Sequence, residues 1–416
     1  MSARFERAIW DPVEQLPRER LRELQLERLR ATVARVPTLD APPPSSLEEV
    51  RHLPFTWKAD LRDNYPFGLL AVPREQLVRV HASSGTHGKP TVVGYTRADL
   101  DRWAELMARS LTMAGVRAGM VVHNAVGYGL FTGGLGFHAG AELVGATVVP
   151  ASGGFSARQA MLLSDLGAHV LASTPSYALV IAQAVRDAGV EVQLELGLLG
   201  GEPFTEAMRE QIELELGLRA MACYGLSEMC GPGVAGECHA REGLHVQEDH
   251  FLMEVVDPDS GEPLPEGEEG ELVFTTLVKE ALPLIRYRTG DIGSVDSGPC
   301  ECGRTFARVT RLVGRRDDML IVRGVNLFPS NVEHLLLGVE EVAPHYRLIV
   351  DRDGPMDELT VECEPSSDGV DRRTLAARLE HLLREHTGIR IAVAVVDPGA
   401  VPRSDGKAVR VVDRRG

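Results

Sequence analysis

The sequence has little that would suit a nucleic acid, a membrane or an oxidising compartment. Its 416 residues carry 60 acidic and 44 basic side chains, and a net charge of −16 argues against a nucleic-acid or anionic membrane partner. No apolar run approaches the roughly 20 residues of a membrane span, and the amino terminus lacks the apolar core of a signal peptide. Six cysteines are too few and too unevenly placed for a disulfide framework. We therefore expect a cytoplasmic protein.

The composition and texture of the chain indicate an α/β protein of more than one domain. The chain exceeds a single domain of roughly 150 residues, and 44% apolar with 25% charged residues is ordinary for a globular protein. Residues 1–75 are expected to be helical, polar and loosely packed. Residues 76–225 alternate β-branched runs with helical stretches, which predicts α/β units around a parallel sheet.

The texture changes after residue 250. Short strand-like runs separated by acidic Pro/Gly turns predict a small antiparallel sheet or distorted barrel. The carboxy-terminal residues have the pattern of a separate α+β module, and the polar, glycine-containing residues 314–318 suit a linker. We therefore predict a large amino-terminal domain over residues 1–316 and a small carboxy-terminal domain over residues 317–416.

Residues 81–90 (HASSGTHGKP) form a Ser/Thr/Gly-rich loop with one lysine, between strand-like residues 77–80 and 91–95. Small hydroxyl residues and glycines let a loop curl around phosphate oxygens with its backbone N–H groups pointing inward. The loop is not a Walker motif, because Lys89 is followed by Pro90 and the first glycine of that spacing would fall on Ser83. A flexible Gly/Ser turn is the alternative interpretation.

Four further segments carry residues suited to nucleotide chemistry. They are residues 224–228 (YGLSE), 287–291 (YRTGD), 314–317 (GRRD) with 324–326 (GVN), and 402–407 (PRSDGK). A tyrosine at a strand end can stack on a purine, a glutamate can hold Mg²⁺ and an aspartate can accept two ribose hydroxyls. Each segment alone could be an ordinary turn, but their order and spacing together argue against coincidence.

Taken together, these segments resemble the adenylate-forming superfamily of acyl-CoA synthetases and adenylation domains, and in particular its phenylacetate-CoA ligase branch. The similarity runs from about residue 53 to residue 413. The segments that narrow it to the branch are residues 128–138, 231–235, 243–246, 248–250 and 317–326. The resemblance implies that ATP and a carboxylic acid form an acyl-adenylate, after which the thiol of CoA displaces AMP.

The resemblance also implies residue roles. Lys407 would bridge the carboxylate and the α-phosphate as the electrostatic catalyst, Glu228 would hold Mg²⁺ with Thr86 or the phosphates, and Asp317 would be the hinge of a mobile carboxy-terminal domain. An exposed tail lysine is the alternative for Lys407. The phosphates and nucleoside would be bound by Ser83, Ser84, Gly85, Thr86, Gly88, Lys89, Gly201, Glu202, Pro203, Tyr224, Gly225, Ser227, Asp291 and Arg315.

The acyl pocket of the family lies near residues 128–137. The candidates for it here are Tyr128, Phe131, Gly134, Phe137 and Ala139. Ordinary core packing is the alternative for each aromatic side chain. Many relatives carry a tyrosine where this chain has Ala139, and the smaller side chain favours a ring-substituted benzoate or phenylacetate.

The cysteines suggest a structural zinc site. Cys300 and Cys302 form a tight C-x-C turn, and Cys238 and His245 flank a loop in the preceding segment. Three thiolates and one imidazole suit tetrahedral Zn²⁺ with no position open for catalysis. The alternative is four unrelated residues.

The sequence leaves two properties undetermined: the thiol that accepts the acyl group, and the oligomeric state. The sequence does not separate CoA from the phosphopantetheine of a carrier protein, as used by stand-alone adenylation enzymes. A non-catalytic nucleotide-binding module is disfavoured because Lys89, Glu228, Asp291 and Lys407 are all present. The resemblance suggests a homodimer.

Overall fold

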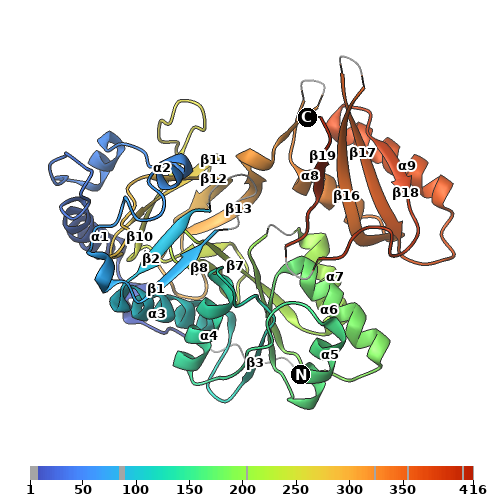
Figure 1. The fold of residues 1–416 in the computed structure, drawn as a ribbon, viewed down its shortest axis with the longest axis horizontal. Coiled ribbons are helices and arrows are strands. Elements are labelled where there is room, and N and C mark those ends of the chain that lie inside the picture. Colours follow the sequence, from blue (N-terminus) through green and yellow to red (C-terminus); the bar gives the residue numbers. More distant parts are fainter. Residues whose placement is uncertain are drawn as a thin grey trace.

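The computed structural model describes residues 8–83, 90–202, 205–322, 325–353, 356–404 and 407–415. A large amino-terminal part contains an eleven-stranded sheet, and a smaller carboxy-terminal part contains a four-stranded sheet. Figure 1 shows the smaller sheet standing to one side of the larger part, next to α6 and α7. The α/β class expected from the sequence is confirmed.

The amino-terminal segment is helical, but the expectation that it packs loosely is wrong. Leu21 and Leu29 are fully buried, and a cluster that includes Leu29 reaches Leu277 and Ile285. A buried ion pair of 2.6 Å joins Glu14 to Arg304. The sequence pattern did not indicate this packing because the partners lie more than 200 residues away. The elements are η1 (Pro12–Gln15), α1 (Arg18–Val33), η2 (Leu47–His52), α2 (Lys58–Asp63) and η3 (Arg74–Gln76).

The parallel half of the large sheet has the strand order β4-β3-β5-β6-β7. Threonine N-caps at Thr174 and Thr205 start its last two helices, and Gly189 and Gly217 end them at positive φ. The elements are α3 (Arg97–Ala114), β3 (Val121–Asn124), α4 (Gly133–Val144), β4 (Thr147–Val149), α5 (Ser156–Asp165), β5 (Val170–Ser173), α6 (Pro175–Ala188), β6 (Leu196–Gly200), α7 (Glu206–Leu216) and β7 (Arg219–Leu226).

The antiparallel strands expected after residue 250 are present, and they continue the same sheet in the order β7-β8-β9-β13-β12-β11-β10. The strand β7 therefore has a parallel neighbour on one side and an antiparallel neighbour on the other. The strands are β8 (Gly231–Glu237), β9 (Leu244–Val246), β10 (Phe251–Val256), β11 (Gly270–Thr276), β12 (Tyr287–Asp296) and β13 (Arg308–Arg315).

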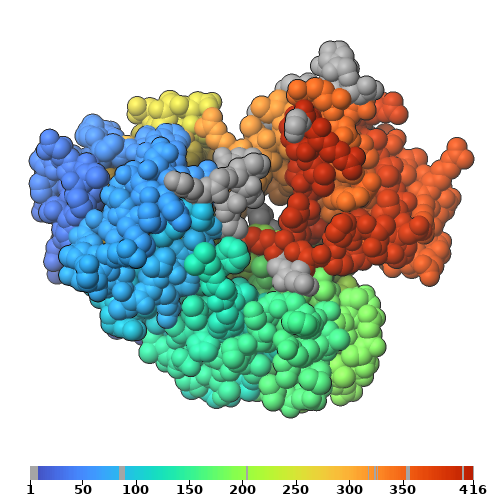
Figure 2. Space-filling model, in the orientation of Figure 1, coloured from blue at the N-terminus to red at the C-terminus, as the bar shows by residue number. Residues whose placement is uncertain are grey.

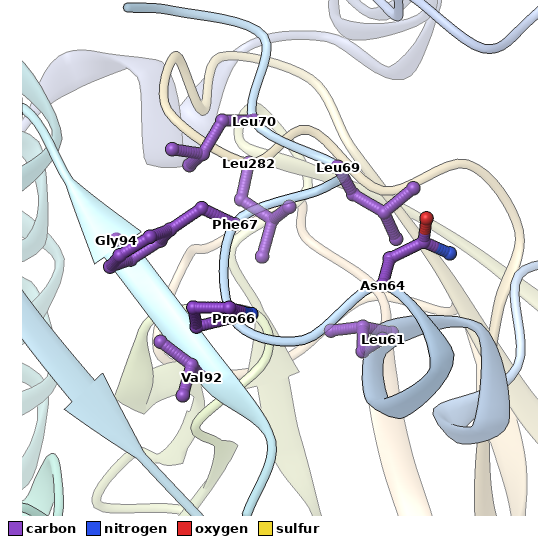
Figure 3. A pocket seen from close by; sticks show the side chains of 9 residues that line it. All are labelled: Leu61, Asn64, Pro66, Phe67, Leu69, Leu70, Val92, Gly94 and Leu282. Carbon is purple, nitrogen blue, oxygen red and sulfur yellow. The ribbon is translucent and has the colours of Figure 1, made fainter. Parts of the chain in front are cut away.

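The predicted phosphate loop is the connection of a separate hairpin. Strands β1 (Arg79–Ala82) and β2 (Val92–Tyr95) pair antiparallel, and residues 84–89 of the connection lie outside the described residues. A small, mainly apolar pocket lies beside β2, with Asn64 as its polar side chain (Figure 3). Its lining residues are Leu61, Asn64, Pro66, Phe67, Leu69, Leu70, Val92, Gly94 and Leu282.

The carboxy-terminal part has its own apolar core around Leu348, Val361 and Leu379. Its main sheet has the order β18-β17-β16-β19, and β14 and β15 form a small hairpin. The elements are η4 (Arg316–Asp318), β14 (Leu320–Val322), β15 (Val325–Leu327), α8 (Pro329–Leu337), β16 (Val342–Asp353), β17 (Met356–Pro365), α9 (Arg372–Thr387), β18 (Ala392–Val395) and β19 (Val411–Asp413). Within the described residues, none of the helices combines the length and apolar character that a membrane span needs.

Candidate active site

Asp291 is the centre of a polar cluster that joins three strands. Tyr224, near the end of β7, donates a hydrogen bond of 2.6 Å from its hydroxyl to Asp291 Oδ2. Arg315, at the end of β13, donates to Asp291 Oδ1 at 3.2 Å and to the carbonyl of Thr289 at 3.0 Å. Burial raises the pKa of Asp291, and Arg315 and Tyr224 oppose that rise. Both carboxylate oxygens are thereby fixed in direction.

Glu228 follows β7 in a tight turn and is 4% exposed. Its carboxylate lies within hydrogen-bonding reach of Tyr287 on β12, and burial together with Glu228 raises the pKa of that phenol well above its usual value. The backbone of the same turn is held from two directions. Lys279 Nζ donates to the carbonyl of Glu228 at 2.8 Å, and the hydroxyl of Tyr95 donates to the carbonyl of Ser227 at 3.2 Å.

Lys407 extends from the carboxy-terminal part toward this cluster. Its Cε lies 3.4 Å from where a Cβ on Gly201 would stand, so the lysine chain passes directly beside this glycine. The side chain stays accessible to solvent. Desolvation by the surrounding protein lowers the pKa of Lys407, while the charges of Glu202, Asp291 and Glu228 oppose that shift. In Figure 2 the red carboxy-terminal residues meet the green and teal residues of the larger part.

The structure brings most of the predicted nucleotide residues together. Tyr224, Asp291 and Arg315 are in direct contact, and Lys407 is within electrostatic reach of them. Gly225 lies where a Cβ would stand 1.8 Å from the carbonyl oxygen of Gly231, so a side chain there would block the β7–β8 pairing. The predicted contacts of Ser84, Gly85, Thr86, Gly88, Lys89 and Pro203 lie outside the described residues.

Two further predicted residues, Ser83 and Asp317, lie where the structure describes the chain only in part. Ser83 precedes the gap, and its backbone N–H donates to the carbonyl of Thr91, which closes the hairpin. The backbone of Asp317 lies in η4, between the last strand of the large sheet and β14.

Tyr128 lies in the connection before α4, and the predicted acyl-pocket residues Gly134 and Ala139 lie on α4 itself. The hydroxyl of Tyr128 accepts a hydrogen bond from Asn124 Nδ2 (2.7 Å) and lies 3.1 Å from His138 Nδ1, next to Ala139. Asn124 also donates to the carbonyl of Gly134. Burial raises the pKa of Tyr128 to about 12, so the phenol stays protonated and can donate to His138.

The two predicted phenylalanines lie in different surroundings. Phe131 is 50% exposed, whereas Phe137 is 3% exposed and belongs to the main apolar core. Core packing, the alternative stated for the aromatic residues, therefore describes Phe137.

Several residues of the site were not given a role from the sequence. Tyr287 belongs to a motif that drew attention only for its aspartate, and Asn124 and His138 depend on contacts with Tyr128. Lys279 lies in the connection between β11 and β12 and has no motif of its own. Two signals could have identified it: the chain has only four lysines, and this one lies in the mainly apolar residues 277–285.

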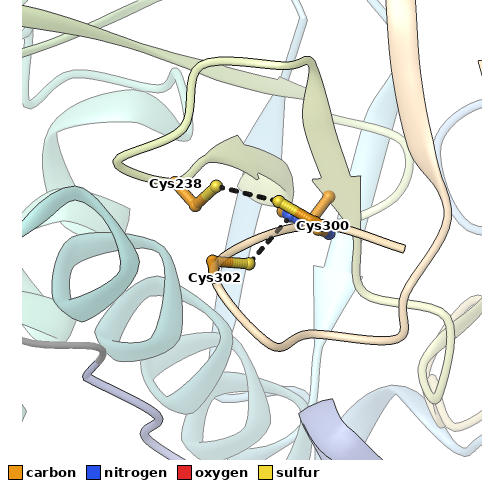
Figure 4. Close-up of side chains that lie close together, drawn as sticks. Cys238, Cys300 and Cys302 are labelled. Atoms are coloured by element: carbon orange, nitrogen blue, oxygen red, sulfur yellow. Dashed lines mark hydrogen bonds between the residues drawn. The ribbon is translucent and has the colours of Figure 1, made fainter. Parts of the chain in front are cut away.

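Cys238, His245, Cys300 and Cys302 form a second, buried cluster, of which Figure 4 labels the three cysteines. Their ligand atoms all lie within 4.8 Å of one another. Cys238 Sγ is 3.6 Å from Cys300 Sγ, and Cys302 Sγ is 3.4 Å from His245 Nε2. His245 Nδ1 contacts the carbonyl of Phe306 at 2.9 Å, which directs Nε2 toward the thiols. The four residues that the sequence grouped thus converge.

Comparisons with known proteins agree with this geometry. The AMP-binding enzyme family model matches residues 15–276, and the model of the AMP-binding enzyme C-terminal domain matches residues 324–415. The phenylacetate-coenzyme A ligase of Thermus thermophilus is 51% identical, over 97% of this chain and 98% of its own length.

Solved structures of a 2-hydroxyisobutyryl-CoA ligase are 28% identical to this chain and cover all of it and 94% of their own chain. The TM-score is 0.93 for that ligase in the postadenylation state with 2-HIB-AMP, and 0.73 for its thioesterification state with 2-HIB-AMP and CoA. The two parts of the present chain are therefore arranged as in the postadenylation structure. The chain belongs to the AMP-binding enzyme family and is an AMP-forming acid–thiol ligase of the phenylacetate-CoA ligase branch of the adenylate-forming superfamily.

Proposed function

We propose that this protein converts an aromatic carboxylic acid, ATP and CoA into an aryl-CoA thioester, AMP and pyrophosphate. In the first step a carboxylate oxygen attacks the α-phosphate of ATP, and pyrophosphate leaves. In the second step the CoA sulfur attacks the acyl carbon, AMP leaves and the thiol proton is released. The observation that carries the proposal is the approach of Lys407 to Asp291 and Glu228 in a chain that matches phenylacetate-coenzyme A ligases along its whole length.

The polar cluster supports distinct roles for its members. Asp291, fixed by Tyr224 and Arg315, would accept the ribose hydroxyls, and Tyr224 would line the adenine. The cation of Lys407 would bridge the carboxylate and the α-phosphate and offset the charge that builds there in the first step. Bringing two anions into line is unfavourable in water, and a fixed cation between them lowers that cost.

The chemistry of Glu228 fits a magnesium ion. It is a buried carboxylate whose nearby partner is a neutral phenol, so an oxygen can serve a hard divalent cation. Glu228 would hold Mg²⁺ with Thr86 or the phosphates, and the ion would neutralise charge on the phosphates. Ser83 and the residues that follow it would enclose the β- and γ-phosphates.

We infer that the acid is phenylacetate or a ring-substituted benzoate or phenylacetate. The support is the name of the Thermus thermophilus relative and the small side chain of Ala139 beside the Tyr128–His138 pair. A short side chain at that position leaves room that a tyrosine would fill. Tyr128, Phe131, Gly134 and Ala139 are the residues proposed to face the acid.

We also propose that residues 317–416 move as one domain about a hinge at Asp317. The support is the separate apolar core of this part and the drop in TM-score between the two states of the 2-hydroxyisobutyryl-CoA ligase. One lysine could then serve the first step and withdraw for the second. Limited proteolysis that releases an intact fragment beginning near residue 317 would support the boundary; cleavage elsewhere first would contradict it.

For the buried cluster we propose a structural Zn²⁺ site. A tetrahedral site with bonds of about 2.3 Å has edges of about 3.8 Å, close to the separations of 3.6 and 3.4 Å between neighbouring ligand atoms. The N–H of Arg304 also donates to Cys302 Sγ at 3.5 Å, and such a donor favours the thiolate form that a zinc ligand needs. Metal analysis of the purified protein should find one zinc per chain, and a substoichiometric content would contradict the site.

The activity is tested by ATP–pyrophosphate exchange over a panel of benzoates and phenylacetates, with acetate and octanoate as controls. The acids that support exchange are then incubated with CoA or with a phosphopantetheinylated carrier protein, and the thioester is detected by mass spectrometry. Exchange with aryl acids and transfer to CoA are expected. Exchange with the aliphatic controls only would contradict the substrate, and transfer to the carrier protein only would contradict the acceptor.

We propose that the protein is a homodimer, as the resemblance suggests. Light scattering on the purified protein should give twice the chain mass of 45.2 kDa, and a monomer mass would contradict it.

A further inference from the structure

Glu202 links the two parts of the molecule through its carboxylate. Its Oε2 accepts a hydrogen bond of 3.0 Å from the backbone N–H of Ala408, the residue directly after Lys407. Its Oε1 accepts a hydrogen bond of 2.7 Å from the backbone N–H of Ser176 and another from the hydroxyl of Ser176. One side chain therefore contacts both the larger part and the segment that carries Lys407.

The contacts of Oε1 fix the carboxylate within the larger part. Ser176 is the second residue of α6, where backbone N–H groups have no partner inside the helix. An anion is favoured at that end of a helix. The carboxylate is therefore in place however the carboxy-terminal part is oriented, and its Oε2 is the acceptor that the Lys407 segment can reach or leave.

The same carboxylate acts on Lys407 directly. Of the charges that favour the ammonium form of Lys407, that of Glu202 is the largest, ahead of Asp291 and Glu228. The neighbouring Gly201, whose φ is +87°, lies directly beside Lys407 Cε. The sequence predicted that Glu202 frames the adenine, and the contacts of its carboxylate with Ser176 and Ala408 add a second role to that prediction.

We propose that Glu202 is a positioning residue that holds the Lys407 segment in the orientation for acyl-adenylate formation and releases it for thioester formation. The inference rests on the proposed function. A single hydrogen bond from a backbone N–H to a carboxylate is strong enough to bias two orientations by about 10- to 100-fold and weak enough to break in each turnover. A ligand or contact can shift such an equilibrium only by its preference for one orientation, and the Ala408 contact supplies that preference.

The test compares the two half-reactions in Glu202→Ala and Glu202→Gln. Acyl-adenylate formation, measured as single-turnover pyrophosphate release, should fall by about 10- to 100-fold. Thioester formation from supplied acyl-adenylate and CoA should stay within about 2-fold of the unaltered enzyme, because that step uses the other orientation. An equal loss in both half-reactions, or no loss in the first, would overturn the proposal.

Ser176→Ala is the matched control. It removes the hydroxyl contact from Oε1 but leaves the Ala408 contact of Oε2. Acyl-adenylate formation should therefore change less than in Glu202→Ala. If Ser176→Ala caused the larger loss, the carboxylate would act through α6 and not through the Lys407 segment.

A distance measurement tests the proposal without any turnover. All six cysteines are buried, so cysteines introduced at the exposed positions Leu214 on α7 and His381 on α9 can be spin-labelled selectively. With AMP bound, the unaltered protein should show one dominant distance, and Glu202→Ala should shift population to a second. Identical distributions would overturn the role of Glu202. Failure of the unaltered enzyme to make aryl-CoA would overturn only the proposed function.

Discussion

Two polar clusters built on the same sheet differ in what they leave open. Cys238, His245 and Cys302 have no exposed surface, and their ligand atoms face one another. Around Asp291, by contrast, Tyr224 and Arg315 are only half-buried, and the charges of Asp291 and Arg315 act on Lys407 of the carboxy-terminal part. A cluster whose groups all face inward can stabilise a fold, whereas one that keeps groups accessible can take part in chemistry.

The clusters also differ in how their charges are balanced. Asp291 is held against Arg315, yet burial still raises its pKa, so its carboxylate is not fully compensated by the protein. Such incomplete compensation is typical of functional sites. The thiol cluster, in contrast, supplies hydrogen-bond donors from its own members. The hydrogen bond from Cys238 is the largest factor that lowers the pKa of Cys302.

The largest effect that separates the two clusters is expected for Lys407→Ala. Acyl-adenylate formation should fall by about 1000-fold, because a cation aimed at the developing charge is lost. Thioester formation from supplied acyl-adenylate should be retained, which rapid-quench assays of each half-reaction would measure. Val409→Ala, at a 78% exposed position two residues on, is the control and should leave both rates unchanged. Equal loss of both half-reactions in Lys407→Ala would contradict the assigned role.

The thiol cluster should respond in stability and not in nucleotide affinity. Cys302→Ser is expected to remove the metal and lower the free energy of unfolding by about 3 kcal/mol or more, because metal binding is coupled to folding. Denaturant titration and metal analysis measure both changes. The control is Cys363→Ala. This residue lies in the core of the carboxy-terminal part, so the variant protein should retain zinc. A stable Cys302→Ser protein that retains zinc would show that Cys302 is not a ligand.

Asp291→Ala should show the opposite pattern. The KM for ATP is expected to rise by about 30- to 100-fold, because two hydrogen bonds from the ribose to a charged acceptor are lost. Zinc content should not change. Ser294→Ala, further along the same strand β12 with its hydroxyl against Thr310, is the strand control. An unchanged KM in Asp291→Ala would separate this carboxylate from ribose binding.

The smallest effect is a pH dependence of stability carried by Lys279. Desolvation by burial lowers the pKa of Lys279 from 10.5 to about 8, with Asp99 as the main opposing charge. Between these values the unfolded chain binds more protons than the folded protein, so this group makes the free energy of unfolding rise with pH.

Lys279→Met should therefore lack that rise. Between pH 8 and pH 10, the free energy of unfolding of Lys279→Met should fall behind that of the unaltered protein by at most about 1.4 kcal/mol per pH unit. Lys58→Met, on α2, is the control. Urea titrations at each pH measure the difference, and parallel curves for Lys279→Met and the unaltered protein would contradict the lowered pKa.

Local sequence signals predicted the elements that depend on local chemistry. The alternation of β-branched and helical runs before residue 225 corresponds to the parallel half of the sheet, and the strand-like runs after residue 250 correspond to antiparallel strands. The four thiol-cluster residues, and Tyr224, Asp291 and Arg315 of the other cluster, were also identified, from residue types and from the motifs of the resemblance. The motif residues carry this information because each role requires a specific functional group.

Contacts between distant segments could not be predicted in this way. The packing of Leu29 against Leu277, the hydrogen bond from Lys279 to Glu228 and the joining of both sheet halves through β8 and β9 all depend on the complete fold. The hydrogen bond between the Glu202 carboxylate and Ala408 likewise joins residues some 200 positions apart in the chain. No periodicity or motif encodes such distances.

The burial of all six cysteines has a consequence for a protein that is proposed to handle a free thiol in every turnover. CoA disulfide and other oxidised thiols exchange with accessible thiolates, and mixed disulfides form at exposed cysteines. This surface offers none. The enzyme should therefore keep its activity and its mass in a cell whose CoA pool has become oxidised, a condition that inactivates proteins with exposed reactive thiols.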